Sequence, residues 1–112
     1  MTDDRTGDQF LKILGALANP HRLRIIAALS ERRAYVSELA RELGISRPLL
    51  HMHLQILETA GLVVGQHEVS AEGKALRYYE VTKFDEQLTP KRITNAAATL
   101  SLDNITKGKA GK

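Results

Sequence analysis

Apolar residues recur at helical spacing near the start of the chain. The i, i+3, i+4, i+7 repeat places side chains on one face of a helix; it consists of Phe10, Ile13, Leu14 and Leu17. Asp8 precedes the repeat and is expected to cap this helix, because its carboxylate can accept a free backbone N–H. Asn19 and Pro20 predict the start of a second helix, since Asn is favoured at the N-cap and Pro is tolerated at the first helical position.

The middle of the chain predicts a short strand followed by two closely spaced helices. A β-like stub at residues 35–36 leads into a helix over residues 38–43 that Ser37 is expected to cap. The next helix covers residues 47–60. Only residues 44–46 connect the two helices, and they begin with a Gly of the kind that ends helices in the left-handed region. This spacing is typical of a helix-turn-helix.

The C-terminal half predicts a hairpin and one more helix. Residues 62–64 and 75–82 are expected to form two strands around a turn at residues 70–74, where Gly73 is free to take a positive φ. A last helix is expected to open at Pro90 and to carry its apolar face as far as residue 105. The order helix, helix, strand, helix, helix, strand, strand, helix predicts a mainly α fold with a small β-hairpin wing, a winged helix-turn-helix.

One domain accounts for the whole length of 112 residues. We expect a disordered N-terminus at residues 1–7, a winged helix-turn-helix over residues 8–105 and a basic, Gly-rich flexible tail at residues 106–112. The absence of Cys excludes disulfides, thiolate metal sites and a Cys nucleophile. Because the sequence has no long apolar run and no apolar leader region, we expect no membrane span and a cytoplasmic location.

The net charge of +3 and a pI of about 9.4 fit a nucleic-acid partner. The basic excess lies in residues 83–112, with six basic and three acidic groups, so a solvated tail explains it equally well. No spacing places a nucleophile beside a base, and no Gly-rich phosphate loop is present, so an enzyme is not expected.

The helix over residues 47–60 has one apolar arc and one polar face. The N-terminal half of the polar face is the part that a major groove would meet. Arg47 can reach a guanine or a phosphate, and Gln55 can pair with adenine, one turn after His51. Ser46 is expected to cap this helix and, with the helix N-terminus, suits a phosphate.

The predicted wing, residues 62–82, carries Lys74 in its turn and Arg77 in its second strand, and we expect both to contact phosphates. The alternative is an ordinary hairpin with solvated cations. Glu68 and Glu72 weaken the basic patch, so the expected contact is modest.

Three blocks of this sequence resemble the ArsR-type winged-helix transcription regulators. They are residues 19–26, residues 37–40 and residues 46–63, the last ending in a His-Leu-x-x-Leu-x-x-Ala-Gly-Leu-Val pattern. The resemblance covers about residues 8–105. It implies a homodimer with two recognition helices in successive major grooves and wings on the flanking backbone. The positions that it implies for DNA reading are Ser46, Arg47, Pro48, Leu49, His51, Met52 and Gln55.

Two departures from the family pattern change the expected chemistry. Many members sense metals through Cys pairs or through acidic and His residues of the last helix, but this chain has no Cys and no His in residues 88–112. We therefore expect no metal and no other cofactor. Pro48, Leu49 and Met52 make the groove-facing patch less polar than usual, so contacts to thymine methyl groups and DNA shape gain weight.

The histidines do not suggest a metal site either. His51 and His53 are two residues apart and point to different faces of a helix. We expect His53 to be buried, His51 to be exposed or to face DNA, and His21 and His67 to lie at the surface.

The first and last helices predict a dimer interface, because no later element covers the last one. The expected interface residues are Phe10, Ile13, Leu14 and Leu17 with Ile93, Ala96, Ala97 and Leu100. The alternative is that these stripes pack into the core of a single chain.

The pattern as a whole predicts a sequence-specific regulator of double-stranded DNA, a homodimer on a near-palindromic operator, reading with the helix at 46–60 and the wing at 62–82. A winged-helix module for protein–protein assembly without DNA binding is the alternative. A regulator that senses an unknown small-molecule effector at the dimer interface is also open.

Overall fold

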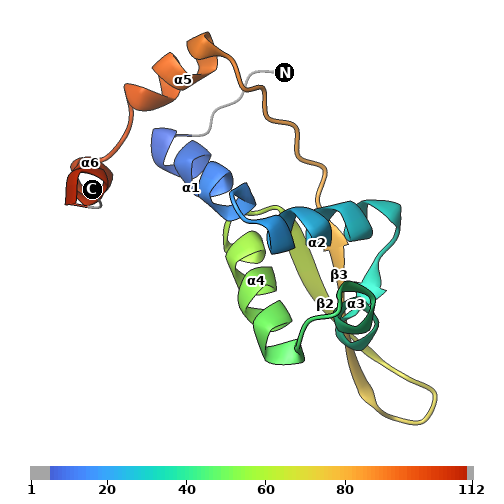
Figure 1. Ribbon diagram of the computed structural model, residues 1–112. Coiled ribbons are helices and arrows are strands. Elements are labelled where there is room, and N and C mark those ends of the chain that lie inside the picture. Colours follow the sequence, from blue (N-terminus) through green and yellow to red (C-terminus); the bar gives the residue numbers. More distant parts are fainter. Residues whose placement is uncertain (1–5, 111–112) are drawn as a thin grey trace.

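A computed structural model describes residues 6–110 as a helical body with a small sheet. Figure 1 shows the β2–β3 hairpin projecting at one end and α5 and α6 lying at the other. The three strands form an antiparallel sheet in the order β1-β3-β2. The elements are α1 (Gly7–Leu17), α2 (Pro20–Glu31), β1 (Ala34–Tyr35), α3 (Val36–Leu43), α4 (Arg47–Thr59), β2 (Val63–Val69), β3 (Ala75–Val81), α5 (Pro90–Ala97) and α6 (Leu102–Ala110). This arrangement confirms the predicted winged helix-turn-helix.

The core lies between α2, α3, α4 and the sheet. Its innermost side chains are completely buried: Ile25, Leu39, Leu50, Leu54, Leu57 and Leu62. α4 supplies three of them at helical spacing, so one face of α4 is fixed on the body and the opposite face is left toward solvent. Among the described residues, no helix is long and apolar enough to cross a membrane.

Local capping signals explain most helix boundaries. The Asn19 side chain accepts the backbone N–H groups of His21 and Arg22 at 2.9 and 3.2 Å, as expected for an N-cap. The predicted cap of α1 was wrong. Thr6 occupies that position in a reciprocal arrangement with Gln9. Asp8 instead accepts the backbone N–H of Ser101 at 2.9 Å, a partner far away in the sequence.

The strand before α3 is displaced by one residue from its predicted position. β1 is Ala34–Tyr35 because Ala34 pairs with Tyr79 in the sheet. α3 then begins at Val36 rather than after Ser37. Glu38 stabilises this start by accepting the backbone N–H of Tyr35 at 3.1 Å.

The wing is longer than the sequence predicted. β2 runs from Val63 to Val69 rather than ending at residue 64, and it pairs with β3 over its full length. Residues 65–68 carry too few apolar side chains to signal a strand by alternation, and their strand conformation comes from pairing with β3. The turn has Gly73 at φ +82°, as predicted.

The predicted last helix, from Pro90 to residue 105, is broken. α5 ends at Ala97, and α6 begins at Leu102 after a bend. Ser101 causes the new start, because its hydroxyl accepts the backbone N–H of Asn104 at 3.2 Å and its own N–H is bound by Asp8. Residues 106–110, predicted as a flexible tail, lie in α6. The disordered N-terminus predicted for residues 1–7 is wrong at its end, because Thr6 caps α1 and Gly7 begins it. Residues 1–5 and 111–112 are outside the described part of the chain.

Candidate nucleic-acid interface

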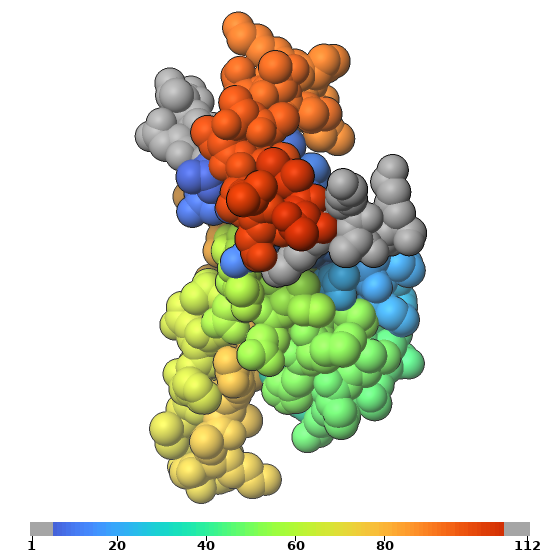
Figure 2. Space-filling view, turned by 90° about the vertical axis from the view of Figure 1, so that its left-hand side faces the viewer, coloured from blue at the N-terminus to red at the C-terminus, as the bar shows by residue number. Residues whose placement is uncertain are grey.

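The outer face of α4 presents the side chains that the sequence analysis selected. Figure 2 shows α4, in green, open to solvent beside the projecting hairpin. Of the seven selected side chains, Leu49 alone is partly covered, and Met52 is 47% exposed. The exposed members are Ser46, Arg47, Pro48, His51, Met52 and Gln55. We name these seven residues the groove face.

The start of α4 is fixed by two local devices. Gly44 takes a left-handed conformation, φ +69°, and turns the chain between α3 and α4. The Ser46 hydroxyl oxygen accepts the backbone N–H of Leu49 at 3.2 Å, which confirms the predicted cap. Arg24 of α2 also donates to the carbonyl of Leu43 at 3.2 Å, so the last turn of α3 is held from a third helix.

The inner side of α4 carries a buried histidine. His53 is 3% exposed, as predicted, and its Nδ1 lies 3.0 Å from a guanidinium nitrogen of Arg22. Burial lowers the pKa of His53, and the nearby Arg22 and His21 lower it further. The prediction that His21 lies at the surface was wrong, since it is half-buried with its ring 5.2 Å from that of His53. His51 and His67 are exposed as expected.

The two wing cations differ in their surroundings. Lys74 is exposed in the turn between β2 and β3. Arg77 contacts other side chains of the same chain. It forms an ion pair with Glu58 of α4 at 3.9 Å, and its guanidinium lies 5.2 Å from the centre of the Tyr79 ring. Both members of the ion pair are well exposed, so the pair is weak and Arg77 can exchange to a phosphate.

Sequence reasoning missed a cluster that fixes the wing to the body. The Tyr35 hydroxyl donates a hydrogen bond to Glu68, which raises the pKa of Tyr35, and Arg33 pairs with the same carboxylate at 3.8 Å. The guanidinium of Arg33 also lies 4.2 Å from the centre of the Tyr78 ring. Glu68 therefore has its charge compensated within the protein. No sequence pattern signals this cluster, because β1 and β2 meet only through β3.

The predicted dimer residues divide into a buried and an exposed group. Phe10, Ile13 and Ala96 are buried within one chain, and Arg92 covers the Phe10 ring at 4.1 Å. Leu14, Leu17 and Leu100 are half-buried, whereas Ala97 and Ile93 are exposed, Ile93 to 48%. The α1 stripe therefore serves the core of one chain first, and α5 retains most of the free apolar surface.

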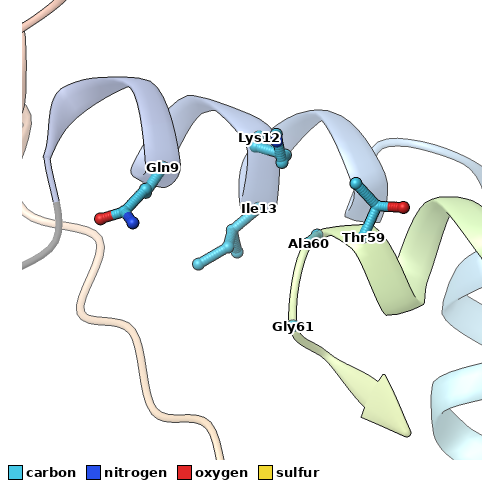
Figure 3. A pocket seen from close by; sticks show the side chains of 6 residues that line it. All are labelled: Gln9, Lys12, Ile13, Thr59, Ala60 and Gly61. Atoms are coloured by element: carbon cyan, nitrogen blue, oxygen red, sulfur yellow. The ribbon is translucent and has the colours of Figure 1, made fainter.

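A pocket lies between α1 and the end of α4 (Figure 3). Its volume is about 300 Å³, and its lining residues are Gln9, Lys12, Ile13, Thr59, Ala60 and Gly61. Within residues 6–110 no three acidic, His or Cys side chains gather in a way that could hold a metal ion.

Comparison with known proteins assigns the chain to a family. The model of the bacterial regulatory protein family arsR matches residues 19–64. An uncharacterized HTH-type transcriptional regulator of Methanocaldococcus jannaschii is 36% identical over 90 residues, which are 76% of this chain and 93% of that protein. This chain belongs to the arsR family.

Further relatives of this arsR-family chain agree with its fold. The HTH-type transcriptional repressor SmtB of Mycobacterium tuberculosis is 42% identical over 55 residues, which are 49% of this chain and 41% of that protein. The solution structure of a homodimeric winged helix-turn-helix DNA-binding domain from Mycobacterium bovis has a TM-score of 0.56 and 22% identity. The matched region covers 92% of this chain and 82% of the Mycobacterium bovis chain. Since its relatives are transcriptional regulators, the arsR-family chain is a winged helix-turn-helix regulator and not an enzyme.

Proposed function

We propose that this arsR-family regulator binds double-stranded DNA in a sequence-specific way, with the groove face of α4 in the major groove. The observation that carries the proposal is the division of α4: Leu50, Leu54 and Leu57 anchor one side in the core, while the polar side at the N-terminal half is open. A helix held in this way can enter a groove without losing its core contacts.

Each groove-face residue has a distinct chemical role. Arg47 can bind guanine or a phosphate, and Gln55 can bind adenine through two hydrogen bonds. The Ser46 oxygen is used by the helix cap, so its O–H is left to donate to a phosphate. His51 lies between Arg47 and Gln55 on the exposed side of α4. The apolar members, Pro48, Leu49 and Met52, suit the methyl groups of thymine.

The wing would add affinity rather than sequence preference. Lys74 is exposed and can neutralise a phosphate, and Arg77 can do the same after leaving Glu58. Because both contacts are to the sugar-phosphate backbone of the DNA, they act alike on every duplex.

A homodimer is part of the proposal. The Mycobacterium bovis domain of the same fold is homodimeric, and this chain exposes apolar side chains at its α5–α6 end, Ile93 to 48%, Ile105 to 53% and Leu102 to 77%. A two-fold dimer requires a near-palindromic operator whose half-sites are roughly 10 base pairs apart, or a multiple of that spacing. Such a regulator would act in the cytoplasm, where the DNA is.

Selection of bound sites from a random duplex library tests the proposal directly. Arg47→Ala and Gln55→Ala should each weaken the selected site by about 1–3 kcal/mol and relax base preference. Lys74→Ala should weaken all duplexes alike, and Lys91→Ala, an exposed cation of α5, serves as the control. If no site is enriched and none of these variants changes binding, α4 is not in a groove, and a protein–protein assembly module becomes the better description.

A further inference from the structure

A buried histidine on the inner side of α4 takes no part in the proposed groove contacts. His53 is 3% exposed and its Nδ1 lies 3.0 Å from Nη1 of Arg22. A guanidinium can only donate, so Nδ1 must be the unprotonated nitrogen of a neutral ring. The proton is then on Nε2, which is buried and has no hydrogen-bond partner among the described residues.

Arg22 connects this histidine to two other helices. Its Nε donates to the carbonyl of Ala16 at 2.6 Å, at the C-terminal end of α1. Its backbone N–H is bound by the Asn19 cap at the start of α2. The Arg22–His53 contact therefore ties the helix that carries the groove face to both α1 and α2.

A second proton on His53 would destroy this contact. It would remove the only acceptor that the ring offers and would place two cations 3.0 Å apart. The charged or titratable groups that act on the ring are Arg22 and His21, both from α2. α1 contributes the Ala16 carbonyl, and α3 and β2 pack on α4 with apolar side chains that include Leu39 and Val63.

We propose that Arg22 and His53 are a positioning pair for α4 that acid breaks, so that this regulator loses DNA affinity as the pH falls well below neutrality. The proposal rests on the proposed function, because it acts through the placement of the groove face. His53 becomes a proton-sensitive element on the far side of the helix that reads the DNA.

The dependence of stability on pH has a definite sign. Burial and the two neighbouring groups lower the pKa of folded His53 below its ordinary value. The unfolded chain therefore takes up this proton first as the pH falls. The stabilisation is complete above the ordinary pKa of about 6.5 and is lost as the pH falls through the lowered pKa of the folded state.

The main experiment measures DNA affinity against pH, using as the probe a duplex selected from a random library. His53→Asn keeps an acceptor oxygen where Nδ1 lies but cannot be protonated. Wild type should lose about fivefold or more of its affinity over a series from about pH 7.5 down to about pH 4.5. His53→Asn should lose this decrease, and His67→Asn, an exposed histidine of β2, should keep it. If His53→Asn and wild type have the same pH profile, the proposal is wrong.

A titration of the free protein by NMR separates failure of this proposal from failure of the proposed function. The ring signals of His53 should titrate below the ordinary range, and the backbone amides of α4 should shift with the same midpoint. Arg22→Gln should raise that midpoint. If no duplex binds at neutral pH, the proposed function fails, and this titration still decides the positioning pair. If the backbone amide signals of α4 do not shift as His53 titrates, the positioning pair is refuted.

Discussion

The close approach of α1 and α5 at Gly7 gives a sharp test of the fold where these two helices meet. A Cβ added at Gly7 would lie 1.9 Å from the carbonyl oxygen of Ala96 and 3.1 Å from the backbone nitrogen of Leu100. Ordinary carbon–oxygen contacts are about 3.3 Å or longer. Both obstacles are backbone atoms, so no side chain can turn aside, and α5 would have to move away by more than an ångström.

The expected loss of stability follows from the contacts that this movement of α5 would break. The backbone N–H of Gly7 donates to Thr99 at 2.6 Å, and Ala96 is 5% exposed beneath α1. Overpacking costs about 1–3 kcal/mol and a lost hydrogen bond about 1 kcal/mol. We therefore expect Gly7→Ala to lower the free energy of unfolding by about 2–4 kcal/mol.

Gly15 of the same helix supplies a matched control. A Cβ at Gly15 would meet nothing within 4 Å, so Gly15→Ala should stabilise the protein by about 0.5–1 kcal/mol through its better helix propensity. Chemical denaturation followed by circular dichroism, and thermal melts at one protein concentration, measure both variants. The melting temperatures of the two should differ by roughly 10 °C or more. Equal stabilities would mean that α1 and α5 do not approach each other as the structure has them.

Three further predictions concern assembly, electrostatics and metals. Ile93→Asp places a charge on the exposed face of α5 and should give monomers by light scattering, with weak DNA binding; a wild-type chain that is already monomeric at tens of micromolar would contradict the dimer. Glu58→Gln releases Arg77 and should strengthen binding to all duplexes by up to about fivefold, which Glu31→Gln should not do; unchanged affinity would show that the ion pair does not restrain Arg77. Zinc or a chelator should leave DNA affinity unchanged, because the chain has no Cys and its described residues form no metal cluster; a stoichiometric metal whose removal changes affinity would refute this.

The features that the sequence predicted correctly are those whose partners lie within one helical turn. Asn19 and Ser46 bind backbone N–H groups no more than three residues away, and the turn at Gly44 depends on its own φ. The exposure of six of the seven groove-face side chains belongs to the same class, whereas their contact with DNA stays a prediction. Once a helix begins at Ser46 and its leucines face the core, the 3.6-residue period alone fixes which side chains remain outside.

The wrong predictions depend on partners that lie far away in the sequence. Asp8 has the chemistry of a cap, but its carboxylate binds the N–H of Ser101, and the same contact helps to start α6 where one continuous helix was expected. Within the candidate site, the bound state of Arg77 depends on Glu58, nineteen residues earlier on another element. Periodicity carries no information on such pairs, because they arise only when the elements pack.

The pairing of charges on the wing predicts how strongly the DNA affinity depends on salt concentration. Glu68 is matched by Arg33 and Tyr35, and Arg77 is held by Glu58, so Arg47 and Lys74 are the exposed groove-face and wing cations ready for phosphates. A dimer would then neutralise about four phosphates, or about six when Arg77 leaves Glu58, and the logarithm of its affinity should fall with the logarithm of salt concentration with a slope of about −3.6 to −5.4. Fluorescence anisotropy over a salt series measures this slope, and Lys74→Ala should reduce its magnitude by about 1.8 because a dimer loses two contacts. A much steeper slope in wild type would mean that other cations reach the backbone. Because phosphate contacts act alike on every duplex, discrimination between operators must come from α4, including the proposed contacts of its apolar groove-face residues to thymine.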